Sequence, residues 1–303
     1  MGSFNYDCYG MRLRSEMALP ELQAASERGA ASGPNVEVSI GPVAANGLGG
    51  GKPLGPFLWA TARELWLQVP NVARFLVRDG REIVIDPHPG IDEDSVRVFL
   101  LGSALGALLL QRGRLVLHGN AVRIGGRCLI CVGRSGVGKS TLAAGFLRRG
   151  YDVLADDVVA VDGECRVLPG FPRIKLWQDA ADRFGIDTRE LPRIRPQLAK
   201  YNYPLAPSIQ GHALDIAWVY VLDTHHQSQI LFEPILGMAR FRFLRVNTYR
   251  VRFLEGMALK AEHLKLCGKL AGKIRLARIT RPEQGCEPDV LIDRILADVG
   301  QCA

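Results

Sequence analysis

A glycine-rich octapeptide in the middle of the chain constrains this sequence more than any other feature. Residues 133–140 read Gly-Arg-Ser-Gly-Val-Gly-Lys-Ser, between the apolar run Cys128–Val132 and a helix-forming stretch, Ser140–Arg149. Glycines at these positions let backbone N–H groups wrap a phosphate, and the following helix adds its positive N-terminal end. The pattern and its strand–loop–helix setting predict a phosphate-binding loop, or P-loop, within an α/β core.

The expected nucleotide contacts come from the loop and the first residue after it. They are Gly133, Arg134, Ser135, Gly136, Val137, Gly138, Lys139, Ser140 and Thr141. Lys139 places its charge on the β- and γ-phosphates, and Ser140 offers its hydroxyl to Mg²⁺. ATP and Mg²⁺ are therefore the expected nucleotide and metal, although base-contacting residues outside the loop decide between ATP and GTP.

Two carboxylates follow one helix later. The strand Asp152–Ala155 is expected to end at Asp156 and Asp157, where P-loop proteins place a metal-binding acid. One carboxylate can bind Mg²⁺, and the other can accept a proton from an attacking hydroxyl. His118 ends the predicted strand Leu115–His118 only a hairpin before the loop, so it can orient a carboxylate or share its proton.

In order and spacing these residues resemble the catalytic domain of HPr kinase/phosphorylase. That family shows a His-Gly pair, a Gly-x-Ser-Gly-x-Gly-Lys-Ser loop, a helix ending in Arg-Gly, and Ala-Asp-Asp-x-Val. The matching residues here are His118-Gly119, Gly133–Ser140, Arg149-Gly150 and residues 155–159. The resemblance covers about residues 115–162. The family's second signature is replaced by Leu168–Trp177, and in this respect the chain is similar to the HPr-kinase-like proteins of lasso-peptide biosynthetic clusters.

The resemblance implies an ATP-dependent kinase that phosphorylates a serine of a peptide or small protein. The C-terminal serine of a lasso-peptide precursor is the acceptor that it points to. It gives Asp156 the role of the base and Asp157 that of assisting the metal, with His118 holding the acidic pair and Lys139 stabilising the phosphate charge. HPr kinases assemble through the catalytic domain, so a homo-oligomer is a further expectation, from the resemblance alone.

The acceptor site is less defined by the sequence. Arg173 and Lys175 flank Ile174 on an extended segment, so both face one way and can hold a phosphate or an acidic peptide. They are equally well explained as ordinary solvent-facing strand residues. Lys200 begins a polar-aromatic segment, Lys200–Tyr203, that reads as a mobile substrate loop.

Two other functions remain open on sequence grounds. The P-loop is equally compatible with a kinase for a sugar or free amino acid. A nucleotide sensor or regulator is the third possibility, because a net charge of +7 favours anionic partners. The sequence has no helix-turn-helix, zinc or RNA-stacking motif, so no nucleic-acid partner is expected.

The predicted architecture is an α/β P-loop kinase domain preceded by a small, mostly-β module, α+β overall. Residues 1–90 form the module, 91–113 a connecting helix that begins at acidic residues, and 114–303 the kinase domain. Tyr9–Ser15 resembles an edge strand, and Arg78–Arg81 a hairpin turn. Five further strands are expected in the module: Val36–Ile40, Phe57–Ala60, Glu64–Val69, Ala73–Val77 and Glu82–Ile85. Two Gly/Ala-rich loops are expected there, Ala30–Gly33 and Ala44–Gly51.

Beyond the carboxylates the chain continues to alternate. Strands are expected at Ile216–Leu222 and Ile274–Ile279, and helices at Phe253–Ala271 and from Pro288 onward.

The chain reads as a cytoplasmic protein without a membrane partner. Its seven cysteines are irregularly spaced, as in reduced thiols, and Cys128 and Cys131 are expected on opposite faces of a buried strand. No secretory signal is visible, and the longest apolar run, Val98–Leu110, is short for a bilayer span.

Overall fold

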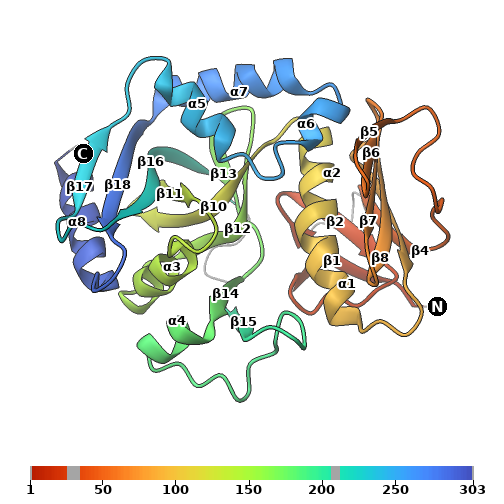
Figure 1. The fold of residues 1–303 in the computed structure, drawn as a ribbon, viewed down its shortest axis with the longest axis horizontal. Coiled ribbons are helices and arrows are strands. Elements are labelled where there is room, and N and C mark those ends of the chain that lie inside the picture. The colour runs from red at the N-terminus through yellow and green to blue at the C-terminus, as the bar shows by residue number, and fades with distance from the viewer. Residues whose placement is uncertain (1, 26–34, 206–211, 302–303) are drawn as a thin grey trace.

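The computed structural model describes residues 2–25, 35–205 and 212–301, so the loop predicted at Ala30–Gly33 lies outside the described residues. Two large sheets lie on either side of a central helical segment (Figure 1). The chain is a mixed α/β protein in which a mostly-β N-terminal part precedes an α/β part that carries the P-loop, as predicted. Within the described residues, no helix is both long and apolar enough to cross a bilayer.

The N-terminal sheet has nine strands in the order β3-β1-β2-β4-β9-β8-β7-β6-β5. Their bounds are β1 Phe4–Cys8, β2 Met11–Ser15, β3 Gln23–Ala24, β4 Val36–Ile40, β5 Lys52–Gly55, β6 Leu58–Ala60, β7 Glu64–Val69, β8 Ala73–Arg78 and β9 Glu82–Pro87. The five predicted strands and the loop at Ala44–Gly51 are confirmed. The strand predicted over Tyr9–Ser15 forms as β2, but its expected place at a sheet edge is wrong, because β2 pairs with β1 on one side and β4 on the other. Tyr9 belongs to the preceding turn.

One long helical segment connects the sheets. It consists of α1 (Glu93–Phe99), a π-helical turn η2 (Leu100–Ala104) and α2 (Leu105–Gln111). The Asp92 side chain caps its N-terminus by accepting a hydrogen bond from the backbone N–H of Ser95 at 2.7 Å. Gly113 leaves the helix with φ +68°, as a helix-ending glycine should. The helix is therefore as predicted, apart from the π-helical turn, which is buried throughout.

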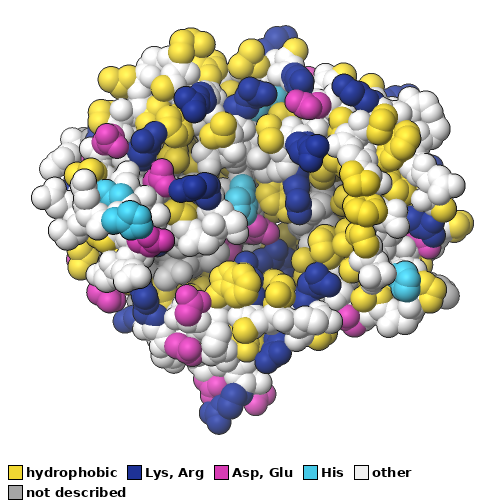
Figure 2. Space-filling view, viewed as in Figure 1, with side chains coloured by type: hydrophobic (Ala, Val, Ile, Leu, Met, Phe, Trp, Pro, Cys, Tyr) yellow, Lys and Arg dark blue, Asp and Glu magenta, His cyan; other side chains and the backbone are white. Residues whose placement is uncertain are grey.

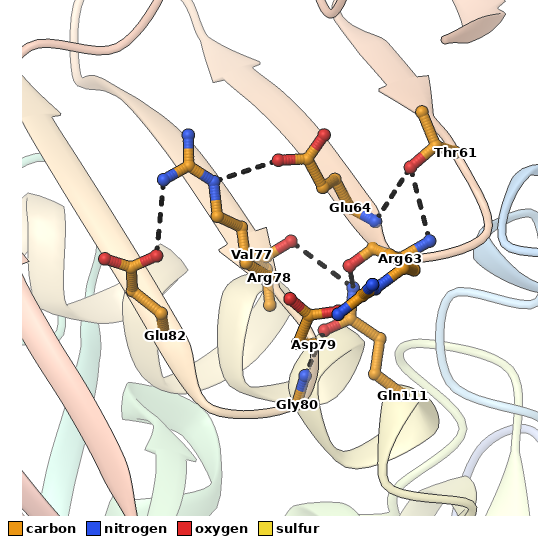
Figure 3. Close-up of polar contacts among 9 residues, drawn as sticks. All are labelled: Thr61, Arg63, Glu64, Val77, Arg78, Asp79, Gly80, Glu82 and Gln111. Atoms are coloured by element: carbon orange, nitrogen blue, oxygen red, sulfur yellow. Dashed lines mark hydrogen bonds and ion pairs between the residues drawn. The ribbon is translucent and has the colours of Figure 1, made fainter.

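The end of this segment is fixed to the N-terminal sheet at the hairpin between β8 and β9 (Figure 3). Asp79 and Gly80 both have positive φ, 53° and 64°, which confirms the predicted turn. The Gly80 N–H donates to Gln111 Oε1 at 2.9 Å. Gln111 Nε2 in turn donates to the backbone carbonyls of Arg63 and Val77, at 3.2 and 3.3 Å. One amide thus satisfies three backbone groups and holds α2 against the sheet.

The second sheet has the order β11-β10-β12-β13-β16-β18-β17. Its strands are β10 Leu115–Ile124, β11 Arg127–Gly133, β12 Val153–Val161, β13 Arg166–Leu168, β16 Leu214–His225, β17 Leu231–Pro234 and β18 Arg275–Pro282. β11 also pairs with β16 in parallel, so the first five strands of this order close into a ring. The strands predicted at Ile216–Leu222 and Ile274–Ile279 are confirmed within β16 and β18.

Helices cover both faces of this sheet. α3 (Lys139–Arg148) and α8 (Pro288–Gly300) share one apolar cluster with it, whereas α5 (Ala239–Val246) and α7 (Lys260–Lys273) share another. Cys131 belongs to the first cluster and Cys128 to the second, so these thiols lie on opposite faces, as predicted. Burial on both faces explains why β11 is apolar without alternation.

Three predicted element bounds are wrong. β10 is one strand, where Leu115–His118 and a separate hairpin arm were expected. β12 does not end at the carboxylates, because the apolar residues after them, Val158–Val161, continue the pairing with β10. The helix predicted over Phe253–Ala271 is broken into α6 (Phe253–Gly256) and α7 by a turn in which Ala258 has φ +57°.

A separate two-stranded ribbon lies beside the P-loop sheet (Figure 1). It pairs β14 (Arg173–Trp177) with β15 (Lys200–Pro204), and a short helix, α4 (Gln178–Arg183), follows β14. The segment Lys200–Tyr203 is therefore a strand, and its prediction as a mobile loop is wrong. Alternate aromatic residues favour strand pairing here over an irregular loop.

Candidate functional site

The P-loop joins the end of β11 to the start of α3. Gly136 and Gly138 have φ of +84° and +99°, in the left-handed region that glycine adopts without strain. A Cβ on Gly133 would come within 2.6 Å of the Leu222 carbonyl oxygen. No side chain in the described part of the chain caps the N-terminus of α3. Its first N–H groups are thus open to an anion.

Lys139 is held over this loop. Its Nζ donates to the backbone carbonyls of Gly133 and Arg134, at 2.7 and 2.9 Å. Burial lowers the pKa of the Lys139 ammonium, whereas the charges of Asp156 and Asp157 oppose that shift. The ammonium is therefore placed where the β- and γ-phosphates of a nucleotide would accept its hydrogen bonds.

Asn120 holds the backbone of Lys139 in place. Sequence reasoning missed this residue. It is fully buried on β10, and its Nδ2 donates to the Lys139 backbone carbonyl. A lone amide within an otherwise apolar strand was the available signal, because a buried amide requires a partner.

Asp156 is in hydrogen-bond contact with Ser140. The Ser140 hydroxyl is 3.1 and 3.2 Å from the two carboxylate oxygens of Asp156. Asp156 is buried, and it also accepts a hydrogen bond from the Lys175 backbone N–H at 2.9 Å. Burial raises the pKa of the Asp156 carboxyl, and the bond from Lys175 opposes the shift.

Asp157 joins a different set of contacts. Its Oδ2 lies 2.7 Å from Lys175 Nζ and its Oδ1 3.3 Å from His118 Nδ1. Burial would raise the pKa of the Asp157 carboxyl, but the Lys175 ammonium and the His118 ring together hold it well below its ordinary value. Asp157 is therefore an anion throughout the physiological pH range.

The backbone explains how neighbouring strand residues share one site. Side chains of consecutive strand residues normally point to opposite faces. Asp157 has φ +74° in the middle of β12, and both carboxylates line the same pocket. A non-glycine residue at positive φ costs free energy and is typical of functional sites.

Two adjoining cavities meet at these residues. The smaller, about 320 Å³, surrounds the P-loop, Ser140 and both carboxylates. The larger, about 790 Å³, extends from the start of the loop to α1 and the end of α5. Five residues line both: His118, Ser135, Asp157, Lys175 and Lys200. Figure 2 shows a hollow near the middle of this face, with basic, acidic and histidine side chains gathered around it.

The structure separates the three predicted acceptor residues. Lys175 and Lys200 line the shared part of the cavities. Arg173 is buried behind them, where Nη1 bonds Asn202 Oδ1 at 2.9 Å and lies 3.7 Å from Glu21. The interpretation of Arg173 and Lys175 as solvent-facing is wrong. The cavity also contains residues without a predicted role, namely Phe99, Tyr249 and Arg250.

The residues fit a magnesium–nucleotide complex. The described residues contain no group of three or more His, Cys, Asp or Glu side chains suited to a resident metal ion. Mg²⁺ bound with a nucleotide needs only one or two protein oxygens, since phosphate and water supply the rest. Ser140 and Asp156, in contact beside the loop, offer those oxygens.

Comparisons with known proteins add little beyond the site itself. No family model and no curated protein matches the chain. Among solved structures it is similar to the Hpr(Ser) kinase/phosphatase from Coxiella burnetii, with 14% identity and a TM-score of 0.33. The match covers 61% of this chain and 90% of that one. At these values the likeness has no bearing on activity.

Proposed function

We propose that this protein is a kinase that transfers the γ-phosphoryl group of ATP to a serine hydroxyl of a peptide or small protein. One observation carries the proposal: the phosphate pocket and the large cavity meet at Asp157, with His118, Lys175 and Lys200 around it. An acceptor in the large cavity would present its hydroxyl to the γ-phosphate beside a carboxylate. A nucleotide site alone does not account for that second cavity.

The donor half consists of the P-loop, Lys139, Ser140 and Asp156. The loop N–H groups and the Lys139 ammonium would bind the phosphates, and Ser140 and Asp156 would hold Mg²⁺. Bound Mg²⁺ neutralises charge on the phosphate oxygens. Asp156 lines only the smaller cavity, and its contact with Ser140 favours the metal role.

The acceptor half is centred on Asp157, which lines both cavities. Its carboxylate accepts the hydrogen bond of the serine hydroxyl and takes its proton as the bond to phosphorus forms. His118 and Lys175 hold that carboxylate in place. This division of roles is the reverse of the one that the family resemblance implies, in which Asp156 is the base and Asp157 assists the metal.

Substitutions at the two aspartates test which of them is the base and which holds the metal. We expect Asp157→Asn to leave Mg·ATP affinity nearly intact and to lower phosphate transfer by about 10²–10⁴-fold. Asp156→Asn should weaken nucleotide binding in the presence of Mg²⁺ but not in EDTA. Calorimetry with a non-hydrolysable ATP analogue and radiolabel transfer measure the two effects. Intact Mg²⁺-dependent binding in Asp156→Asn, together with lost transfer, would restore the original assignment.

An acceptor screen tests the proposed activity itself. The large cavity exceeds what free serine or a simple sugar requires, so we expect serine peptides to be phosphorylated and free serine not. A precursor-like peptide ending in serine, as in lasso-peptide biosynthesis, belongs in this screen beside peptides with internal serine. Mass spectrometry reports a gain of one phosphate. Transfer to free serine or sugars alone would identify a small-molecule kinase, and no transfer at all would refute the proposal.

A further inference from the structure

We infer that the large cavity binds an acidic segment of the acceptor, with an apolar residue between two carboxylates. The inference deepens the proposed function and rests on it. It follows from the balance of charge in the cavity wall, which contains four cationic side chains and two carboxylates besides His118.

Two of those cations are already neutralised. Lys175 pairs with Asp157 at 2.7 Å, and Arg134 pairs with Asp223 at 3.0 Å. The other two, Lys200 and Arg250, have no carboxylate partner among residues 2–25, 35–205 and 212–301. Lys200 Nζ lies 5.2 Å from the ring centre of Trp177, and the Arg250 guanidinium lies 5.8 Å from the ring centre of Tyr249 and contacts the Tyr249 hydroxyl.

Of these two cations, Lys200 is the one beside the phosphate pocket. It lines both cavities and is only partly exposed, beside Lys175. Burial lowers the pKa of the Lys200 ammonium and the neighbouring charge of Lys175 lowers it further, whereas the charges of Asp157 and Asp156 oppose the shift. An acceptor carboxylate near the serine would relieve this repulsion, since an opposite charge at close range favours the ammonium form.

Arg250 offers a second, separate anchor. It belongs to the turn after α5, whereas Lys200 belongs to β15. Arg250 is exposed and is held with φ +49°. A guanidinium in this position can bind a carboxylate through two parallel hydrogen bonds.

Apolar side chains complete the wall. Val98 and Phe99 come from α1, and Phe243 and Val246 from α5. Val246 is 62% exposed, and it lies at the cavity rather than at a packed interface. A peptide with an apolar side chain between acidic ones matches this wall. A nucleic acid matches it less well, because two isolated cations do not follow a phosphate backbone.

Peptide binding tests the inference without any transfer step. The probes are fluorescein-labelled peptides with alanine in place of the serine and a leucine flanked by two Asp, two Asn or two Lys. We expect the Asp peptide to bind the full-length protein about 10-fold more tightly than the Asn peptide at low salt. The difference should shrink as salt is raised. Equal binding, no binding, or tighter binding of the Lys peptide or of an RNA oligonucleotide would overturn the inference.

Charge reversal adds a sharper test. Arg250→Glu should weaken binding of the Asp peptide and strengthen binding of the Lys peptide. Lys200→Met should reduce the preference for the Asp peptide over the Asn peptide. Arg127→Glu is the matched control, because Arg127 is exposed at the far end of the β10–β11 hairpin. The same peptides with the serine restored separate this inference from the proposed kinase activity. Phosphate transfer without charge preference refutes only this inference, whereas charge-selective binding without transfer refutes only the kinase.

Discussion

The contact between Lys175 and Asp157 sets the charge of the proposed base. The two groups are 2.7 Å apart, and the Lys175 side chain is only 9% exposed. Solvent therefore screens this pair less than a surface ion pair. A carboxylate held in this way stays ionised at neutral pH and keeps an orientation toward the cavity. In the proposed mechanism the lysine therefore acts through Asp157.

Replacing Lys175 should change the pH dependence of the reaction. In Lys175→Met the Asp157 carboxyl loses its cationic partner, so its pKa should rise. The acid limb of the kcat/KM profile should move to higher pH by the same amount, because the base is protonated earlier as pH falls. Lys175→Arg keeps the charge and should keep the limb in place. An unmoved limb in Lys175→Met would mean that Asp157 is not the titrating group.

Among single residues, the sequence could predict those of the nucleotide site far better than those of the acceptor cavity. The P-loop residues and both carboxylates are close in sequence, so a local pattern brings them together. Lys200 reaches the site only through the pairing of β15 with β14, in which Trp177 lies opposite it. Arg250 reaches it through the turn after α5. Such long-range placement leaves no local spacing to recognise.

Among the elements, β10 is held in place by a close approach to the backbone of β11. It lies between β11 and β12 in the second sheet and carries His118 and Asn120. Between them, Gly119 packs against β11 so closely that a Cβ would collide with the backbone carbonyl oxygen of Cys131. A backbone atom in a sheet cannot move aside as a flexible side chain can.

Gly119→Ala should therefore destabilise the protein by about 1–3 kcal/mol, as overpacking in a core does. Gly126→Ala, at the turn of the same hairpin, meets no atom within 4 Å and should change stability by less than about 0.5 kcal/mol. Urea unfolding of both variants, followed by circular dichroism, provides the comparison. Equal free energies of unfolding for the two variants would show that β10 and β11 can move apart without loss of stability.

The elements that the sequence predicted well are those with strong local signals. The hairpin at Asp79-Gly80 and the helix capped by Asp92 are examples. The extension of β12 past Asp157 was missed because paired acids usually mark a strand end, whereas here β10 continues to pair with Val158–Val161. Tertiary pairing outweighed the local preference.

In the whole molecule, the N-terminal sheet is joined to the P-loop sheet near the candidate site. The Tyr9 hydroxyl donates to the Val158 backbone carbonyl at 2.8 Å, and the Tyr9 N–H donates to the Pro169 carbonyl at 2.9 Å. Val158 follows the carboxylates directly, so the N-terminal part buttresses β12 at the site. One apolar cluster also spans both sheets and the central helix, which favours unfolding of the two parts as a unit.

A buried histidine should govern how that unfolding depends on pH. His263 on α7 contacts Thr248 Oγ1 through Nε2 at 2.8 Å, and the same hydroxyl donates to the Leu244 carbonyl. Because the hydroxyl proton is already used, Nε2 must carry the imidazole proton and donate it. Cys267 Sγ lies 3.7 Å from Nδ1. Burial, together with the nearby charge of Arg245, lowers the pKa of His263 to about 4.

The unfolded chain binds a proton at His263 more tightly than the folded chain does. The unfolded imidazole titrates near pH 6.5, so protons bind the unfolded chain first as pH falls, and stability is lost between pH 6.5 and about 4. This single group should lower the free energy of unfolding by about 2 kcal/mol between pH 7 and pH 5. His263→Gln should remove that loss, and His88→Gln, at an exposed histidine, should retain it. Urea unfolding at both pH values measures the difference, and the same pH dependence in His263→Gln as in the wild type would contradict the buried neutral histidine.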